Sequence, residues 1–455
     1  MRCTDLGNAE ALVRHMDGDY HYSLTDGEWY RWNGRVWESN SLHHVYSLSK
    51  TTLRTMKEVS VETADEKGQR WAERSEHIQR LKAMVELSQY EPTIPIVLTD
   101  FDTRPSLFNV TNGTIDLETG RLYPHDKTQL LMKLSDVTYD PTALCPKWEL
   151  ALLEMFDFDT ELVEWVQRAV GYSLTAYTHE QVLFFLRGVG QNGKSLFLNI
   201  LHAILGPYAK HLHSHTLMSH NSNNNAKDSD IARMVGARLV TAVESRKGQA
   251  WDEELVKQIT GSDSYVSARF LRHDTFQFKP TWKTWFSSNY YPDVKSITDV
   301  SIWRRLRVIG FPHQFVPGKD RNPHLEEELR LELVGILSWA VQGCRKWMEH
   351  GLGEMPVSMQ KEIEEYKKEV DVLGSFLEDM CVIHPKMQIG VGDLYDTYMK
   401  WCKLNGMVPV SKIEFGKKIG EIKDVEQDRT SSVRVWRGIG IGNIPAAKLW
   451  DFKDE

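Results

Sequence analysis

Near the middle of the chain, a glycine-rich stretch stands between two apolar segments. Residues 188–195 read G-V-G-Q-N-G-K-S, which matches the spacing G-x-x-x-x-G-K-S, and the preceding residues 182–186 are an apolar run. Apolar residues then recur at helical spacing, namely Leu196, Phe197, Leu198, Ile200, Leu201, Ile204 and Leu205. Strand, loop and helix in this order are the setting that a phosphate-binding P-loop requires. The stretch therefore predicts an α/β fold.

The residue types in this loop suit a triphosphate. Glycines let the backbone turn tightly and approach phosphates, so that N–H groups and the N-terminus of the next helix face negative charge. The lysine is expected to reach the β- and γ-phosphates, and the serine to ligate Mg²⁺. A glycine-rich turn with a chance Lys-Ser pair is the alternative, which the flanking elements disfavour. We expect ATP and Mg²⁺ at Gly188, Gly190, Asn192, Gly193, Lys194 and Ser195.

Composition limits the class of protein. A length of 455 residues predicts two to four domains, and no apolar run approaches the ~20 residues of a membrane span. Residues 1–20 are polar, which argues against a signal peptide, and the 5 cysteines are scattered, so a reducing, cytoplasmic location is expected. The net charge of −8 argues against a surface that is basic throughout. Any DNA contact must therefore be local.

Two later apolar runs end in polar residues that fit nucleotide hydrolysis. Residues 236–243 lead into Glu244, about fifty residues after the P-loop. A carboxylate at the C-terminal end of a buried strand can organise Mg²⁺ or polarise the attacking water, as a Walker B acid does. Residues 284–288 lead into Asn289, which can hold that water or sense the γ-phosphate. The alternative for Asn289 is a turn-forming residue before Tyr290.

An arginine pair follows the third run. Arg304 and Arg305 lie in the sequence I-W-R-R-L-R-V-I. Arginines beyond such a strand can stabilise transition-state charge in a neighbouring subunit's site, although surface arginines are common. The sequence leaves open which of the two acts.

The N-terminal part contains two ambiguous patterns. Residues 29–37 are rich in tryptophan around Asn33-Gly34, which predicts a hairpin with a packed aromatic core, or alternatively a base-stacking platform. Asp100 and Asp102 alternate after an apolar run and could hold metal ions for primer synthesis, but no further carboxylate or basic set accompanies them. A solvated or capping pair is the preferred interpretation. The histidines of the polar tract 211–230 indicate a mobile loop rather than a metal site.

The C-terminal part predicts a separate DNA-binding unit. Residues 355–370 are charged and suggest a linker helix, followed by two short helices at 393–404 and 411–422 and a strand at 433–437. Helix, turn, helix and wing form a winged-helix pattern. Residues 400–437 contain 9 Lys or Arg and 5 Asp or Glu, a net charge of +4. This excess favours DNA contact, although winged helices also bind proteins.

Taken together, the P-loop, Glu244, Asn289 and the arginine pair resemble the superfamily 3 helicases, which are AAA+ ATPases, and in particular the helicase half of phage and poxvirus primase-helicases. The resemblance implies an AAA+ core at residues 146–350, a small α+β collar or oligomerisation domain at 1–145, and a linker helix with a winged helix at 351–455. It further implies a pore hairpin after the segment 251–263. Its candidate DNA contacts are Arg269, Arg272, His273 and Lys279.

The resemblance also implies a function. We expect an ATP-hydrolysing DNA helicase that forms a ring, in the family a hexamer, and draws single-stranded or forked DNA through its pore during phage, viral or mobile-element replication. A separate primase or polymerase is an expected partner, and a membrane is not. Departures from the pattern are the single acid at Walker B, with Ser245 following Glu244, and the absence of a full primase domain. The alternatives are a primase-helicase and an origin-binding initiator or packaging ATPase that does not unwind DNA.

Overall fold

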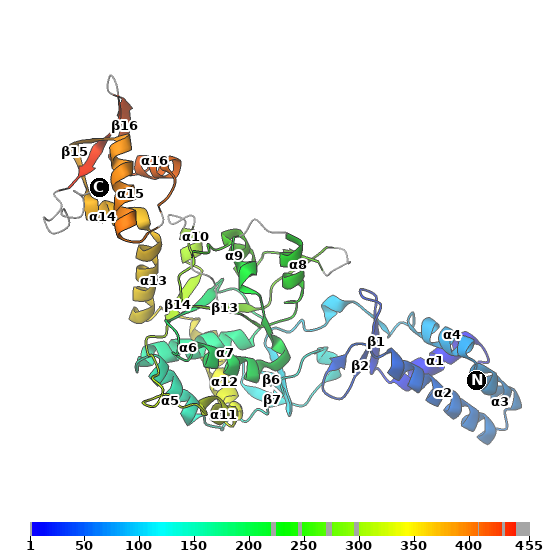
Figure 1. The fold of residues 1–455 in the computed structure, drawn as a ribbon. Helices are drawn as coiled ribbons and strands as arrows, with labels where there is room; N and C mark the ends of the chain where they lie inside the picture. Colours follow the sequence, from blue (N-terminus) through cyan, green and yellow to red (C-terminus); the bar gives the residue numbers. More distant parts are fainter. Residues whose placement is uncertain are drawn as a thin grey trace.

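The computed structural model describes residues 2–219, 224–243, 248–269, 275–294, 300–407, 409–429 and 433–442. Figure 1 shows three parts along the chain: an N-terminal lobe, a central α/β body, and a C-terminal lobe reached through helix α13. No helix in these ranges is long and apolar enough to cross a membrane.

The N-terminal lobe packs four helices against a small sheet. The helices are α1 (Asp5–Met16), α2 (Leu42–Glu62), α3 (Glu66–Ser75) and α4 (Ile78–Ser88). The sheet has the order β3-β2-β1-β4, with β1 (Tyr20–Ser23), β2 (Trp29–Trp32), β3 (Trp37–Glu38) and β4 (Pro95–Ile96). Strands β2 and β3 pair antiparallel around the Asn33-Gly34 turn, which confirms the predicted hairpin. Trp29 and Trp37 are 1% and 2% exposed, so they fill the core and present no free stacking surface.

The central body contains a five-stranded parallel sheet with the order β14-β8-β13-β10-β9. Its strands are β8 (Leu183–Arg187), β9 (Ala209–His211), β10 (Leu239–Val243), β13 (Lys283–Ser288) and β14 (Leu306–Gly310). The helices around it are α5 (Pro146–Met155), α6 (Thr160–Leu174), α7 (Lys194–Leu205), α8 (Asn224–Ala232), α9 (Glu253–Thr260), α10 (Val300–Trp303), α11 (Leu325–Arg330) and α12 (Leu333–His350). The sheet thus provides the strand, loop and helix that the P-loop pattern predicts.

Both faces of the sheet are buried, which explains why its strands β8 and β10 consist mainly of apolar residues. Side chains alternate between the two faces of a strand. Phe184 and Leu186 accordingly join the core with α5, α6, α7 and α12, whereas Leu183 and Phe185 join the core on the other side. Figure 1 shows α6, α7 and α12 on one side of β13 and β14, and α8, α9 and α10 on the other. Two cores therefore hold the P-loop strand from both sides.

A small antiparallel sheet, β5 (Leu107–Val110), β6 (Gly113–Asp116) and β7 (Arg121–Tyr123), precedes the central body in the chain. Phe108, Val110 and Ile115 nevertheless belong to the same hydrophobic core as α5 to α7. The core of the central body therefore extends across residue 145, where the sequence suggested a domain boundary.

The C-terminal lobe follows helix α13 (Val357–Val370). It contains α14 (Val372–Met380), β15 (Cys381–Gly390), α15 (Val391–Leu404), α16 (Lys412–Gly420), β16 (Glu426–Arg429) and β17 (Arg434–Ile441), with the sheet order β15-β17-β16. The two predicted helices are present as α15 and α16, and the Ser411 side chain accepts a hydrogen bond from the Glu414 N–H, as an N-cap does. The strand predicted at 433–437 corresponds to the first part of β17, which begins at Arg434 and continues to Ile441.

One further hairpin packs against the central body, since Val266 and Ala268 belong to its hydrophobic core. Strands β11 (Val266–Ala268) and β12 (Phe276–Phe278) pair antiparallel, with Val266 opposite Phe278. The connection between them includes residues 270–274, which are outside the described ranges.

Candidate nucleotide site and basic hairpin

The P-loop backbone adopts a conformation that requires its glycines. Gly190 and Gly193 have φ values of 100° and 86°, in the region that L residues rarely adopt. A Cβ on Gly193 would also lie 2.6 Å from the Met155 side chain of α5. At Gly188, a Cβ would lie 2.0 Å from Asn192 Nδ2. The glycine spacing therefore follows from the shape of the loop and its close contact with α5.

Lys194 lies beneath this loop at the start of α7. It is 6% exposed, and its Nζ donates to the Gly188 carbonyl at 2.6 Å, to Asn192 Oδ1 at 3.0 Å and to Asn289 Oδ1 at 3.2 Å. Burial, with a smaller contribution from the Arg187 charge, lowers the pKa of Lys194 to about 8. Its partners in the described structure are uncharged oxygens. The ammonium group is thus held at the point where phosphate would supply the missing negative charge.

Asn289 reaches Lys194 because β13 lies beside the P-loop strand. Ser287 and Ser288 of β13 are in register with Leu186 and Arg187 of β8 in a parallel pair. The next residue on each strand is Asn289 and Gly188, so both follow the same edge of the sheet. Asn289 lies 95 residues after Lys194 in the chain and was predicted from the apolar run that precedes it. The structure brings it into contact with this P-loop lysine.

The predicted Walker B acid, Glu244, lies outside the described residues. The description of β10 ends at Val243, which is in register with Ser287 of β13. Val243, Ser287 and Asn289 all line the cavity above the P-loop. Strand β10, which Glu244 follows directly in the sequence, therefore ends at the candidate site.

A cavity of about 680 Å³ covers the P-loop. Besides residues 190–196, it is lined by Leu150, Ala151, Glu154 and Met155 of α5 and by a segment from Phe315 to Glu328 that includes Asp320, Arg321, Asn322 and Pro323. This segment is fastened to the loop, since the Phe315 N–H donates to the Gln191 carbonyl at 2.8 Å. Sequence reasoning assigned neither α5 nor the segment 315–328 to the site, because neither contains a recognisable nucleotide-binding motif.

Ser195 is exposed at the edge of this cavity, in the first turn of α7. Its hydroxyl is a suitable Mg²⁺ ligand. Among the described residues, no three His, Cys, Asp or Glu side chains gather as a metal site. The donor set fits a metal ion that arrives with a nucleotide and takes most of its ligands from phosphate and water, since Mg²⁺ keeps several waters and few protein ligands.

The two predicted arginines have different environments. Arg305 is 8% exposed, and its guanidinium donates to Thr260 Oγ1 at 3.1 Å and to the Ser301 carbonyl at 2.7 Å. Arg304 is exposed, and its guanidinium has no hydrogen-bond partner among the residues the structure describes. Both precede β14, at the opposite end of the sheet from the P-loop. Arg305 therefore joins α9 to α10, whereas Arg304 remains available to another molecule.

Comparison with known families covers most of the chain in three segments. Residues 9–157 match a family described as D5 N terminal like, residues 186–305 match a family of unknown function (DUF5906), and residues 368–437 match a family described as poxvirus D5 protein-like. Two viral relatives are the "Putative helicase L207/L206" of Acanthamoeba polyphaga mimivirus and the "Putative helicase 022R" of Frog virus 3 (isolate Goorha). The first is 27% identical over 341 residues and the second 24% over 279 residues.

The chain is thus similar to viral proteins that are named putative helicases, and its two terminal segments match D5 families. The aligned regions are 70% and 58% of this chain but 35% and 28% of the two relatives, so the chain spans about a third of their length. Among solved structures, the A form apo structure of the NrS-1 C-terminal region is similar in fold, with a TM-score of 0.50 at 11% identity, covering 94% of this chain and 98% of that one. The similarity in fold thus extends through all three parts.

The candidate pore residues are only partly described. Arg269 follows β11, and its N–H donates to the Asp228 carbonyl at 3.4 Å. Lys279 follows β12, where its Nζ lies 5.3 Å from the centre of the Tyr265 ring and 3.8 Å from Asp263. Arg272 and His273 lie outside the described residues. The structure therefore places two of the four candidates at the base of one hairpin.

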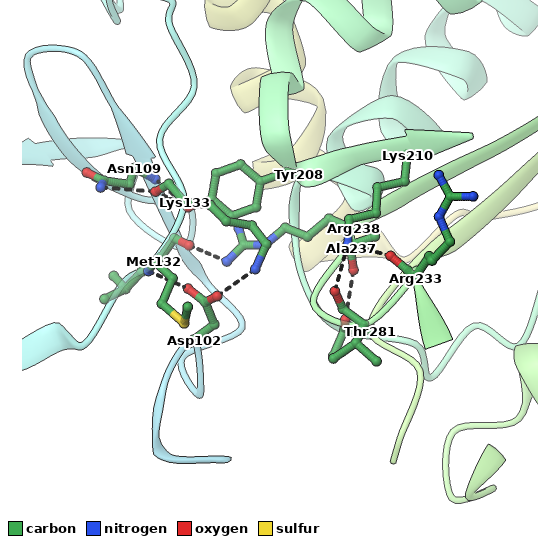
Figure 2. Close-up of polar contacts among 12 residues, drawn as sticks. Asp102, Asn109, Met132, Lys133, Tyr208, Lys210, Arg233, Ala237, Arg238 and Thr281 are labelled. Carbon is green, nitrogen blue, oxygen red and sulfur yellow. Dashed lines mark hydrogen bonds and ion pairs between the residues drawn. The ribbon is translucent and has the colours of Figure 1, made fainter. Parts of the chain in front are cut away.

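The acidic pair of the primer-synthesis alternative lies in the N-terminal lobe. Asp102 pairs with Lys133 at 2.7 Å and accepts the Met132 N–H at 3.0 Å. Figure 2 shows Asp102 facing Lys133. Asp100 accepts the Val97 N–H at 3.3 Å, as a capping residue does. The contact of Asp100 fits the preferred capping interpretation, whereas the ion pair of Asp102 with Lys133 was not predicted from the sequence.

Proposed function

We propose that the chain is an ATP-driven DNA helicase of the superfamily 3, AAA+ type, which acts as a hexameric ring. The observation that carries this proposal is the contact of Lys194 with Asn289 under a loop that its glycines shape, below a cavity large enough for a nucleotide. In this proposal a triphosphate takes the place of the Gly188 carbonyl as partner of Lys194. Asn289 then lies beside the terminal phosphate, where it orients water. Glu244 is the proposed base.

ATP binds with Mg²⁺ in this proposal, and the ion neutralises phosphate charge. Ser195 is the described residue that would hold it. Met155 and Leu150 of α5 and Pro323 offer apolar surface to the base, and Asn322 offers hydrogen-bonding groups to the base or ribose. These groups bind and orient the nucleotide, and they exclude water from one side of it.

The exposure of Arg304 supports assembly as a ring. The β8 strand separates the arginine pair from the P-loop by five residues, or about 16 Å in an extended strand. The Leu183 N–H donates to the Arg305 carbonyl at 2.8 Å, which fixes the pair at the far end of that strand. Arg304 therefore cannot reach the nucleotide of its own chain. We assign it to the site of the next subunit, where it stabilises charge on the transferred phosphate.

The basic hairpin and the C-terminal lobe supply DNA contacts in this proposal. Arg269 and Lys279 lie at the base of the β11–β12 hairpin, which is assigned to the pore. The C-terminal lobe is assigned as a winged helix, because α15, α16 and the β16–β17 hairpin follow one another in that order and the region 400–437 is basic. Single-stranded DNA passing through the ring would contact the hairpin through its phosphates.

The test compares wild type with Lys194→Ala and with Lys82→Ala, an exposed lysine of α4. ATP hydrolysis is measured with and without single-stranded DNA, together with unwinding of a forked duplex and the native mass. DNA-stimulated hydrolysis and unwinding by a ring-sized species, lost in Lys194→Ala and kept in Lys82→Ala, are expected. Hydrolysis that is indifferent to DNA, or sequence-dependent duplex binding without unwinding, would instead indicate an initiator or packaging ATPase.

A further inference from the structure

A second cavity lies at the edge of the central sheet, away from the P-loop. Its volume is about 600 Å³, and it is bounded by the end of α7, the edge strand β9 and the end of α8. The residues that line it are His202, Ala209, Lys210, His211, Ala232, Arg233, Met234 and Val235. His202 is eight residues beyond Lys194 on α7, which corresponds to about 12 Å along a helix. The proposed nucleotide site does not include any of these residues.

The described lining of the cavity includes a lysine and an arginine but no acidic residue. Its described lining contains one lysine, one arginine and two histidines, and no Asp or Glu. Burial, together with the charges of Lys133 and Arg233, lowers the pKa of Lys210 to about 8. The carboxylate of Asp102 already pairs with Lys133 at 2.7 Å. The positive charges at this edge are therefore uncompensated within the described chain.

The two cationic side chains are positioned differently. Lys210 Nζ donates to the Arg233 carbonyl at 2.5 Å and to the Val235 carbonyl at 3.1 Å, which anchors the end of α8 to β9. The Arg233 guanidinium is exposed and has no partner among the residues that the structure describes. Figure 2 shows Lys210 and Arg233 near each other, beside the junction that contains Arg238 and Lys133. Arg233 is thus free to bind a ligand next to a fixed ammonium group.

The imidazoles of the wall are also held in place. Thr241 Oγ1 lies 2.8 Å from His202 Nε2 and 2.7 Å from His211 Nδ1, and the two rings stack at 4.1 Å. One hydroxyl can donate to one of these nitrogens and accept from the other, so the bridge fixes both rings. Burial, and secondarily the His211 charge, lowers the pKa of His202 to about 4. This ring is therefore neutral near pH 7 and adds a polar wall without charge.

We propose that this edge cavity binds a phosphate group, either of a nucleic acid strand or of a free nucleotide, as a second anion site separate from the P-loop. An arginine fork beside a lysine, in a concave site without carboxylates, is the arrangement that recognises phosphate. A bound phosphate would offset the repulsion between the charges of Lys210 and Arg233. A flat or convex basic surface would suit an acidic protein partner equally well, whereas the concave shape favours a small, compact anionic group.

The test uses the full chain and the variants Arg233→Ala and Arg233→Lys, with Arg74→Ala on α3 as a matched exposed control. Binding of a fluorescein-labelled oligothymidylate is measured by anisotropy across a KCl series without nucleotide. We expect Arg233→Ala to weaken binding about fivefold and to reduce the salt slope by about 0.7, the value for one phosphate contact on a single strand. Arg233→Lys should keep most of the affinity, and Arg74→Ala all of it.

A second arm distinguishes the source of the phosphate. Pyrophosphate binding is followed by phosphorus NMR in a Lys194→Ala background, with and without Arg233→Ala. Loss of pyrophosphate binding alone assigns the site to a free nucleotide, and loss of oligonucleotide affinity assigns it to a nucleic acid strand. If Arg233→Ala changes neither, the cavity is not a phosphate site. Neither arm depends on ATP hydrolysis, so the result is independent of the proposed helicase activity.

Discussion

Lys194 is a cation whose partners in the described structure are a carbonyl and two amide oxygens. Its folded-state pKa of about 8 lies below the ordinary lysine value of 10.5, because burial disfavours the charged form. Between these two values the unfolded chain binds more protons than the folded chain. Stability therefore rises with pH in this window. Below about pH 8, the folded protein bears the full free-energy cost of burying the charged lysine. A bound anion would reduce this cost, so the site favours anion binding.

The first prediction concerns that cost. Between about pH 7 and about pH 9.5, the free energy of unfolding of wild type should rise relative to Lys194→Met by about 2 kcal/mol, the value that the two pKa values imply. Urea unfolding of both proteins at each pH measures the difference. Other buried cations, such as Lys210 and Lys283, titrate in both proteins and cancel. Parallel curves for the two proteins would mean that the Lys194 ammonium is not desolvated.

The second prediction separates the neighbouring arginines. Arg305→Ala should lower the free energy of unfolding by about 2–4 kcal/mol, because Thr260 and the Ser301 carbonyl lose a charged partner in a buried place. Arg304→Ala should change stability by less than about 0.5 kcal/mol, because its side chain is exposed. The same variant should bind ATP and fail to hydrolyse it. Normal hydrolysis by Arg304→Ala would remove its assignment to the neighbouring site.

At the scale of elements, α13 is more than a connection. Its apolar side carries Met359, Ile363 and Tyr366, which enter the cores of the central body. The Tyr366 hydroxyl accepts from Trp251 Nε1 at 2.8 Å and donates to the Pro292 carbonyl at 2.5 Å. Its ring stacks on Tyr291 at 4.3 Å. Helix α13, which leads to the C-terminal lobe, is therefore hydrogen-bonded to Pro292, three residues after Asn289. We expect a displacement of α13 to move the segment that carries Asn289.

The third prediction tests this attachment. Tyr366→Phe removes a buried hydroxyl and leaves the Trp251 N–H and the Pro292 carbonyl without their partner, so it should cost about 1–3 kcal/mol of stability. Tyr90→Phe, at a tyrosine that is 70% exposed, is the matched control and should cost almost nothing. Chemical denaturation measures both. Equal stability of the two variants would show that the hydroxyl of Tyr366 is not part of the packing.

At the scale of the whole molecule, the proposed site is divided between copies of the chain. The P-loop and Asn289 lie at the C-terminal ends of the strands, and Arg304 lies at the other end of the sheet. In the proposed ring these two ends would meet between neighbours, since a head-to-tail interface joins different surfaces of identical subunits.

The fourth prediction follows from that division. Lys194→Ala and Arg304→Ala should each be inactive alone, whereas an equimolar mixture should recover roughly a quarter of wild-type ATP hydrolysis, because random assembly pairs an intact lysine with an intact arginine at that fraction of interfaces. Hydrolysis by the mixture after co-refolding or subunit exchange measures this. A mixture as inactive as its components, at a mass that shows assembly, would place both residues in the site of a single chain.

Local patterns in the sequence were sufficient for a large part of this protein. The P-loop, its strand and its helix, the hairpin at residues 29–37 and the helices α15 and α16 follow from spacing, turn residues and caps, which act within a few residues. The position of Asn289 also follows, because an apolar run that ends in a polar residue marks the end of a buried strand. Family comparison agrees with the helicase resemblance that these motifs carry.

Tertiary structure alone decided the remainder. The pairing of β8 with β13 brings Asn289 to Lys194, and the packing of α9 against α10 buries Arg305 while its neighbour Arg304 stays exposed. Three further features join residues that are far apart in the chain. They are the wall of the nucleotide cavity formed by α5 and the segment 315–328, the core that crosses residue 145, and the cavity at β9 that Lys210 and Arg233 line. Such contacts depend on strand register and on which face of the sheet a helix covers, and local residue preferences do not encode either of them.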